Sequence, residues 1–229
     1  MKYAIVDNEK VEASKGIKGV CPICQQPVIP KCGQFKIDHW AHKSVAHCDK
    51  WWENETEWHR NWKNLFPKEW QEVVAFDEIT GEKHIADIKT NMGLIVEFQH
   101  SHISDEERVS REEFYKTMIW IVDGTRRKND YNRFIKAIDN KDILHFKDNN
   151  RLWFYGPGNY LPKEWLFSKV PVIFDFKGLL DIQNDYDINR REHLWCLFPR
   201  EKGLKFILEI PRDTFIDNIL NGREFLNYK

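Results

Sequence analysis

The sequence predicts a mixed α/β fold of the α+β kind, with a small N-terminal zinc-binding subdomain and a strand-rich C-terminal extension. Three observations predict it. Residues 1–50 hold four of the five Cys, and residues 51–142 alternate helical and strand patterns. Residues 143–229 are dense in strand patterns and in Trp, Phe and Leu. We expect these three stretches to be the domains of the protein.

Composition narrows the classes of function. The 229 residues suffice for one large domain or two small ones, and the formal net charge of −1 creates no global basic field. Binding to nucleic acid would therefore need a local patch. The sequence contains no apolar run long enough to predict a membrane span, and its first residues lack the apolar core of a signal peptide. We expect a cytoplasmic protein, in which disulfides are rare and the Cys need another explanation.

A zinc site is the explanation that the first stretch favours. Cys21 and Cys24 form a CxxC pair, a hairpin pattern follows over 28–37, and His39 and His42 come next. Placed at i and i+3 on the first turn of a short helix, the two His would complete a tetrahedral Cys2His2 site. A thioredoxin-like redox motif is disfavoured because no βαβ pattern surrounds the pair. Three residues stay open as replacement or spare ligands: Cys48, His47 and Cys32.

The second stretch opens on a helical pattern over 51–63. Glu55, His59 and Lys63 fall at i, i+4 and i+8 on one face, and the apolar side is formed by Trp51, Trp58, Trp62 and Leu65. This is either an ordinary surface helix or a polar stripe that lies over a metal site.

Two strand patterns carry acidic residues among apolar ones. Asp87 lies in HIADIKT, and Glu97 and Gln99 lie in LIVEFQ. A carboxylate buried in a strand needs compensation for its charge, and a divalent cation can supply it to two carboxylates at once. Pairing the strands places Asp87 opposite Val96 or Glu97, and only the second register puts the carboxylates on one face. The alternative is a solvent-facing hairpin with surface acids.

The patterns around these strands complete the order α-β-β-β-α-β-α. A strand is expected within 69–78, a capping box at Ser104 and Glu107 begins a helix through about Tyr115, and 118–122 reads as a buried parallel strand. A helix over about 130–140 follows.

This order, with an acid on the second strand and ExQ on the third, resembles the PD-(D/E)XK nuclease superfamily, whose core is restriction-endonuclease-like. More closely, residues 20–125 resemble the competence protein CoiA-like family. The matching motifs are CPxC with HWAH, the ETxxHxxxK run from Glu55, Asp87, and EFQHSHIS followed by Arg111 and Tyr115.

The resemblance implies a Mg²⁺- or Mn²⁺-dependent hydrolase that cleaves DNA, in DNA uptake and processing or in a phage or defence context. Asp87 and Glu97 would hold the metal, and Gln99 would orient the attacking water where the superfamily usually has Lys. Glu55 and His59 would assist. Contacts to nucleic acid are expected from Lys63 and Arg111, and the zinc leader would be structural or would grip DNA.

The third stretch is covered less by the resemblance. Strands are expected over 151–155, 171–176, 193–198 and 204–210, and a helix over 213–221. They would extend the nuclease sheet or form a small cap. We expect Trp153, Trp165 and Trp195 in the core rather than as base-stacking platforms. The basic run 126–128 could meet phosphates or form a solvated loop.

Two other functions compete with catalysis. One is a non-catalytic nucleic-acid-binding module on a degenerate nuclease fold, and the other is a scaffold in a transformation or defence machine. The near-neutral charge leaves room for a homodimer or partner proteins. Whether DNA would be single- or double-stranded stays open.

Overall fold

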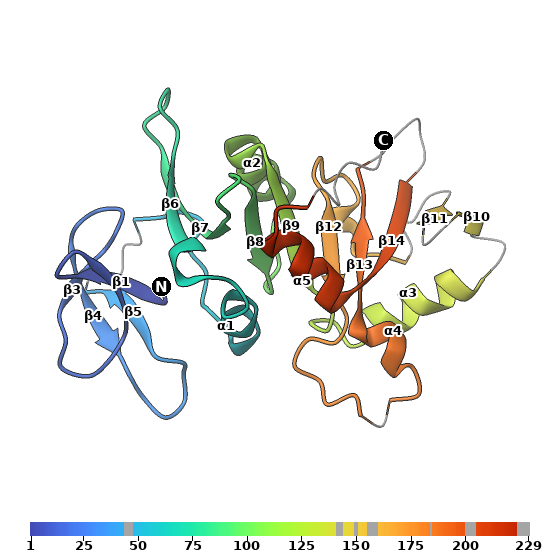
Figure 1. Cartoon of the computed structure of the whole chain (residues 1–229), viewed down its shortest axis with the longest axis horizontal. Helices are drawn as coiled ribbons and strands as arrows, with labels where there is room; N and C mark the ends of the chain where they lie inside the picture. Colours follow the sequence, from blue (N-terminus) through green and yellow to red (C-terminus); the bar gives the residue numbers. More distant parts are fainter. Residues whose placement is uncertain are drawn as a thin grey trace. The chain divides into compact units, whose positions relative to one another are not determined.

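The computed structural model describes residues 1–43, 48–140, 144–148, 151–154, 160–183, 185–199 and 205–223, with the backbone alone for 144–148, 151–154 and 205. The chain forms two compact units, Met1–Lys89 and Thr90–Lys229 (Figure 1). Both helices and strands occur, with sheets dominating, which confirms the predicted α+β class. The domain bounds 1–50, 51–142 and 143–229 stay a prediction.

The first unit begins with an antiparallel sheet in the order β2-β1-β3-β4-β5. Its strands are β1 (Tyr3–Val6), β2 (Glu9–Glu12), β3 (Gly19–Val20), β4 (Pro27–Lys31) and β5 (His39–His42). A small core of Ala4, Ala13, Cys21, Val28 and Trp40 lies against it. The Trp40 indole also donates to the Val11 carbonyl at 2.8 Å, which ties β5 to β2.

The predicted hairpin over 28–37 is only half right. β4 pairs with β5, in the register Ile29↔Ala41, so the returning strand begins at His39 and the connection spans 32–38. The helix expected under His39 and His42 is wrong, because β5 occupies these residues. Trp40, 1% exposed, fits a strand that turns one face to the core.

The rest of the first unit contains helix α1 (Glu57–Lys63), a short 3₁₀ turn η1 (Lys68–Trp70) and the antiparallel strands β6 (Gln71–Phe76) and β7 (Lys83–Lys89). The helix begins at Glu57 rather than at Trp51 because Thr56 is its N-cap, with a side chain that accepts from the His59 amide at 3.3 Å. Trp58 and Trp62 are buried as predicted, whereas Leu65 is 43% exposed.

The second unit contains a sheet in the order β8-β9-β12-β13-β14-β11-β10. The first three are parallel and the others antiparallel. The strands are β8 (Ile95–Gln99), β9 (Met118–Asp123), β10 (Leu144–Asp148), β11 (Arg151–Phe154), β12 (Val172–Asp175), β13 (His193–Leu197) and β14 (Lys205–Pro211). Because β12 pairs with β9, the C-terminal strands extend the sheet, the first of the two predicted alternatives.

Helical segments lie between these strands, and one follows the last of them. They are α2 (Asp105–Tyr115), α3 (Asp130–Asp139), the 3₁₀ turn η3 (Lys163–Trp165), α4 (Ile188–Glu192) and α5 (Arg212–Leu220). Ser104 caps α2 and accepts from the Glu107 amide at 3.1 Å, as predicted. All residues of β9 are buried, which confirms the parallel core strand. Neither β10 nor α4 was predicted from the sequence.

The core of the second unit is aromatic. Trp120, Phe174 and Trp195 are each at most 1% exposed, and Trp165 is 2% exposed. Trp165 and Trp195 therefore lie in the core as predicted, while the side chain of Trp153 lies outside the described residues. Arg126 and Arg127 of the basic run both contact the carboxylate of Glu164, at 3.3 and 3.0 Å.

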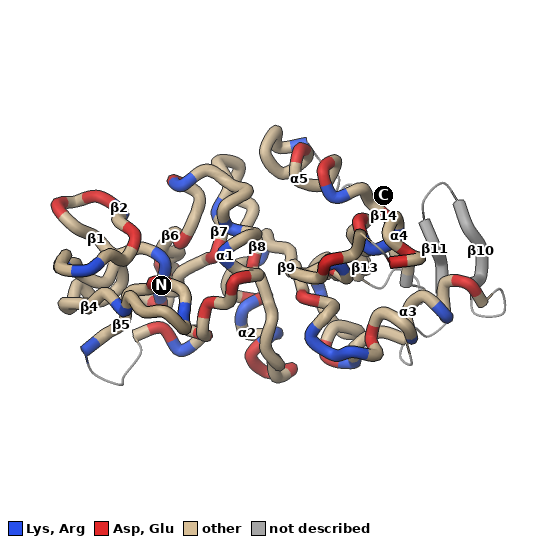
Figure 2. The backbone as a smooth tube through the Cα atoms, turned by 90° about the horizontal axis from the view of Figure 1, so that it is seen from below, with Lys and Arg blue, Asp and Glu red and all other residues tan. Residues whose placement is uncertain are grey.

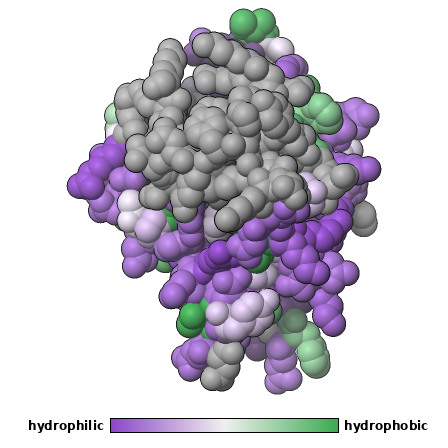
Figure 3. Space-filling model, turned by 90° about the vertical axis from the view of Figure 1, so that its right-hand side faces the viewer, coloured by the Kyte–Doolittle hydropathy of each residue, from purple (hydrophilic) through white to green (hydrophobic). Residues whose placement is uncertain are grey.

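Charge is spread along the chain rather than gathered. Lys and Arg alternate with Asp and Glu along the described backbone (Figure 2). On the face shown in Figure 3, the described residues are mostly hydrophilic, and hydrophobic residues are isolated among them. In the described part of the chain, no helix combines the length and the apolar character that a membrane crossing requires.

Candidate functional site

Four ligand side chains gather in the first unit. The donor atoms of Cys21, Cys24, His42 and Cys48 all lie within 4.8 Å of one another. The sulfurs of Cys21 and Cys48 are 3.5 Å apart, and the sulfur of Cys24 is 3.3 Å from the Nε2 atom of His42. Three sulfur donors and one imidazole nitrogen are a donor set that suits a tetrahedral zinc ion. The cluster could hold such a metal.

The cluster contains the replacement ligand Cys48 and leaves His39 outside. Side chains alternate between the two faces of a strand, so His39 and His42 on β5 cannot turn toward the same ion. The Nδ1 atom of His39 instead lies 2.8 Å from the Ile37 carbonyl. Cys32 also lies outside the cluster, and His47 lies outside the described residues.

A hydrogen-bonded link joins the segment after Cys48 to β7. One carboxylate oxygen of Asp49 lies 2.7 Å from the Nδ1 atom of His84, and the other accepts from the Ile85 amide at 2.9 Å. Trp51 stacks on the His84 ring with the centroids 3.3 Å apart. Burial opposes ionisation of Asp49, but the hydrogen bonds from His84 and from the Ile85 and Trp51 amides together outweigh it and lower the pKa of this carboxyl. The strand that carries Asp87 is thus held beside the metal-ligand cluster.

Lys63 is the centre of a second, carboxylate-rich cluster in this unit. Its ammonium nitrogen lies 3.1 Å from Glu55, 3.0 Å from Glu72 and 3.1 Å from Asp87. Glu72 and Asp87 lie on the paired strands β6 and β7, and both carboxylates approach this one ammonium, where like charges repel each other. The lysine, only 4% exposed, compensates both. A surface phosphate contact, predicted for Lys63, would need a different arrangement of this side chain.

Burial and neighbouring charges shift the pKa values of this cluster in opposite directions. Burial alone would raise the pKa of Glu55, but Lys63 and Arg60 outweigh it and lower that pKa to about 2. Burial likewise lowers the pKa of Lys63, yet the three carboxylates raise it well above its usual value. Glu55, Lys63 and Glu72 are therefore all charged at neutral pH.

Glu72 is a residue that sequence reasoning missed. Its two oxygens accept from the backbone amides of Lys2, at 2.7 Å, and Tyr3, at 2.9 Å. One side chain thereby joins the start of β1 to Lys63. An acid at the start of a predicted strand was a visible signal, but its partners are about 70 residues away in sequence.

His59 takes part in the cap of α1. Its Nδ1 atom accepts from the Thr56 amide at 3.3 Å, and its Nε2 atom lies 3.3 Å from a carboxylate oxygen of Glu53. The ring is 3% exposed. Its predicted assistance in catalysis stays a prediction.

The ExQ pair, Glu97 and Gln99, lies on β8 in the second unit. Glu97 is 4% exposed and accepts from Arg111 of α2 at 3.2 Å, and Arg111 also contacts Glu107. Gln99 is buried, and its amide nitrogen donates to the Ser101 hydroxyl at 3.1 Å, which orients the amide. Arg111, predicted to contact nucleic acid, is here a buried counter-charge for Glu97.

Asp87 belongs to the first unit and Glu97 to the second. Each has a protein cation beside it within its own unit. A metal ion shared between the two carboxylates stays a prediction.

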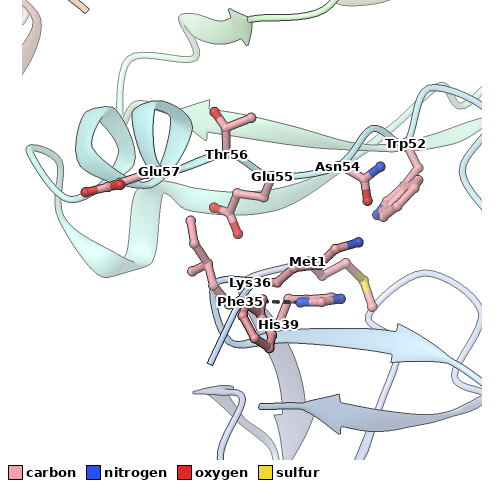
Figure 4. A pocket seen from close by; sticks show the side chains of 10 residues that line it. Met1, Phe35, Lys36, His39, Trp52, Asn54, Glu55, Thr56 and Glu57 are labelled. Carbon is pink, nitrogen blue, oxygen red and sulfur yellow. Dashed lines mark hydrogen bonds between the residues drawn. The ribbon is translucent and has the colours of Figure 1, made fainter. Parts of the chain in front are cut away.

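One pocket of about 390 Å³ lies in the first unit, between the 32–38 connection and the segment that leads into α1 (Figure 4). Two predicted site residues line it, Glu55 and His39. Trp52 and Asn54 lie along its edge, and Glu55 points toward the connection.

The comparisons with known proteins match two separate parts of the chain. Residues 4–50 match the model described as competence protein CoiA, N-terminal domain, and residues 78–173 match the model described as competence protein CoiA, nuclease-like domain. The chain belongs to the competence protein CoiA family. Neither the comparison with curated proteins nor the comparison with solved structures found a match.

The matched ranges sort the candidate residues. All four members of the Cys/His cluster lie in the range of the CoiA N-terminal model. Asp87, Glu97, Gln99 and Arg111 lie in the range of the nuclease-like model. Glu55, His59, Lys63 and Glu72 lie between the two ranges. The chain therefore carries a nuclease-like CoiA domain and a separate group of metal-ligand residues.

Proposed function

We propose that the protein is a metal-dependent nuclease that hydrolyses phosphodiester bonds of DNA during DNA uptake and processing. The observation that carries the proposal is the buried carboxylate of Glu97 in the middle of β8, inside the range that matches the nuclease-like domain. Burying an acid in a core strand is costly even with a partner, and a function at that position accounts for it.

Asp87 and Glu97 would hold Mg²⁺ or Mn²⁺, because carboxylate oxygens suit these hard cations. When bound, the metal would polarise the phosphate and lower the pKa of a bound water. Lys63 contacts Asp87 and Arg111 contacts Glu97, so each acid has a protein cation beside it within its own unit.

Gln99 would orient the attacking water through its amide, which Ser101 holds in place. An amide carries no charge, so the positive charge usual at this position must come from elsewhere. Lys63 is the candidate, because its ammonium lies 3.1 Å from Asp87.

The Cys/His cluster would hold a structural Zn²⁺. All four donors come from protein side chains, so a tetrahedral ion is closed to substrate. In a sheet with a core as small as that around Trp40, such an ion contributes strongly to folding.

The proposal is tested with Asp87→Asn and Glu97→Gln, which keep the side-chain shape and remove the charge. Each variant should abolish Mg²⁺-dependent cleavage of DNA while circular dichroism and zinc content stay those of the wild type. The matched controls are Glu78→Gln, near β7, and Glu113→Gln, on α2; both acids are exposed. Equal cleavage by the wild type and both site variants would overturn the proposal.

A non-catalytic nucleic-acid-binding module is the second candidate. It is favoured by the ion pairs that already satisfy Asp87 and Glu97 and by Gln99 in place of Lys. Binding of DNA without cleavage across a titration of Mg²⁺ and Mn²⁺ would select it.

A further inference from the structure

The pocket in the first unit has two walls that are fastened together by one side chain. Arg60 of α1 donates to the Asp38 carbonyl at 3.0 Å and to the Glu55 carboxylate at 2.6 Å. The first contact holds the 32–38 connection, and the second holds the segment before α1. The pocket is therefore built by specific bonds and does not depend on a chance approach of two loops.

Aromatic rings stand at this pocket in contact with solvent. Phe35 is 98% exposed, an unusual state for a ring of its size, and Trp52 is partly exposed. Exposed apolar rings beside a hollow mark a binding surface. Flat rings of this kind are surfaces on which nucleobases stack.

The polar groups of the pocket favour a ligand that donates hydrogen bonds. The Nδ1 atom of His39 must donate to the Ile37 carbonyl, so the Nε2 atom of the neutral ring is an acceptor. Glu55 adds a carboxylate and Asn54 an amide that can accept or donate. Adenine, cytosine and guanine carry an exocyclic amine that can donate to such groups, whereas thymine carries none.

The cations near the pocket favour different parts of a nucleotide. Arg60 and Lys63 already offset the charge of Glu55, while Lys36 offers a cation to a phosphate on the opposite, exposed connection. A base can enter with its amine edge toward Glu55, and its phosphate can stay outside beside Lys36. A volume of about 390 Å³ lies in the range of pockets that hold small organic ligands.

We propose that this pocket binds an unpaired, amine-bearing base of single-stranded DNA. Bases in a duplex are stacked and paired and cannot enter such a pocket unless they are flipped out. Glu55 also contacts Lys63, which contacts Asp87, so a strand held here would lie against the charged cluster. The inference rests on the proposed function and deepens it, since it names single-stranded DNA as the substrate class.

The test measures binding apart from cleavage. Fluorescence anisotropy follows labelled oligo(dC), oligo(dT) and a duplex, titrated with the zinc-loaded full chain in Ca²⁺ in place of Mg²⁺. The wild type should bind oligo(dC) more tightly than oligo(dT) or the duplex. Trp52→Ala and Phe35→Ala should each weaken oligo(dC) binding by about tenfold, the usual loss when a stacking ring is removed. Asn54→Ala should reduce the preference for oligo(dC) over oligo(dT).

Matched controls separate the pocket from a general effect of surface charge or surface apolar area. Phe167→Ala removes a ring that is 74% exposed in the second unit, and it should leave binding unchanged. Lys36→Glu should weaken binding, and Lys18→Glu, at another exposed lysine, should not.

The outcomes distinguish this inference from the proposed nuclease activity. Selective binding of oligo(dC) that Trp52→Ala and Phe35→Ala weaken supports the pocket even if no DNA is cleaved in Mg²⁺. The inference is overturned if the wild type binds no single strand, if it binds oligo(dT) or duplex as tightly as oligo(dC), or if the pocket variants bind like the wild type. In the last case the pocket would bind a different ligand, such as an apolar peptide.

Discussion

The first unit holds two clusters of metal-binding side-chain types that differ in what balances their charge. In the Cys/His cluster, the donor atoms of Cys21, Cys24, His42 and Cys48 converge within 4.8 Å. In the other, the acids Glu55, Glu72 and Asp87 surround the ammonium group of Lys63 at 3.0 to 3.1 Å. The first cluster could take up a metal ion, whereas the second contains its own cation, Lys63.

Because of this difference, we expect the two clusters to depend on bound metal to different degrees. Three neighbouring thiols lose their protons together only when a cation stabilises the thiolates, so we expect zinc binding to add to the stability of the fold around the Cys/His cluster. The carboxylate cluster is compensated by Lys63 without a divalent ion. We therefore expect zinc to govern folding and Mg²⁺ to govern activity alone.

The largest effect should come from removing a sulfur ligand. Cys24→Ser or Cys48→Ser should release zinc and unfold the N-terminal sheet, because a structural zinc ion supplies roughly 10–16 kcal/mol of apparent binding energy. Zinc content and thermal unfolding measure this. Cys32→Ser is the control, since Cys32 lies outside the cluster; a stable, zinc-free Cys48→Ser variant would break the comparison.

A pair of histidine variants sharpens the ligand set. His42→Ala should lower zinc content, while His39→Ala should retain the ion, because the two side chains leave β5 on opposite faces. Zinc loss in both variants would contradict the ligand set that contains Cys48.

Next in size is the loss of the internal cation. Lys63→Met should destabilise the protein by about 3–5 kcal/mol, the usual effect of breaking a buried ion pair, because three acids lose their partner. Chemical denaturation measures it, with the exposed Lys68→Met as control. A neutral result would mean that the carboxylate cluster does not depend on Lys63.

The pH dependence of stability is a smaller effect. The pKa of Glu55 is lowered to about 2 in the folded protein, from near 4.5 when it is unperturbed. Its contribution is thus present above about pH 4.5 and is lost as the pH falls toward 2. Glu55→Gln should reduce stability at pH 7 and flatten the acid limb of the stability curve. An unchanged acid limb would mean that Glu55 does not form this ion pair in solution.

The smallest effect concerns the helix that presents Lys63. Thr56→Ala removes the N-cap of α1 and should cost about 1 kcal/mol of stability, whereas Thr56→Ser keeps the capping oxygen and should restore most of it. Urea denaturation of both variants checks this. Equal destabilisation by Ala and Ser would show that the cap is not the cause.

Local signals in the sequence predicted the second unit well. Ser104 with Glu107 located the start of α2, and the apolar run from Met118 located β9, because each pattern reports on neighbours a few residues away. The same kind of pattern predicted β11, β12, β13 and β14, but it missed β10.

The candidate site was predicted only in part, since its partners are far apart in sequence. The acids Asp87 and Glu97 were visible as charges within strands, but the counter-charges Lys63 and Arg111 were assigned to nucleic acid. The pair His39 and His42 has helical spacing, and only the pairing of β5 with β4 reveals that its members face opposite ways.

Anomalous scattering from a crystal soaked in Mn²⁺, recorded at the zinc and manganese edges, tests the central claim most directly. We expect a zinc peak among Cys21, Cys24, His42 and Cys48 and a manganese peak at the carboxylates of Asp87 and Glu97. Manganese peaks elsewhere and none at these two acids would contradict it.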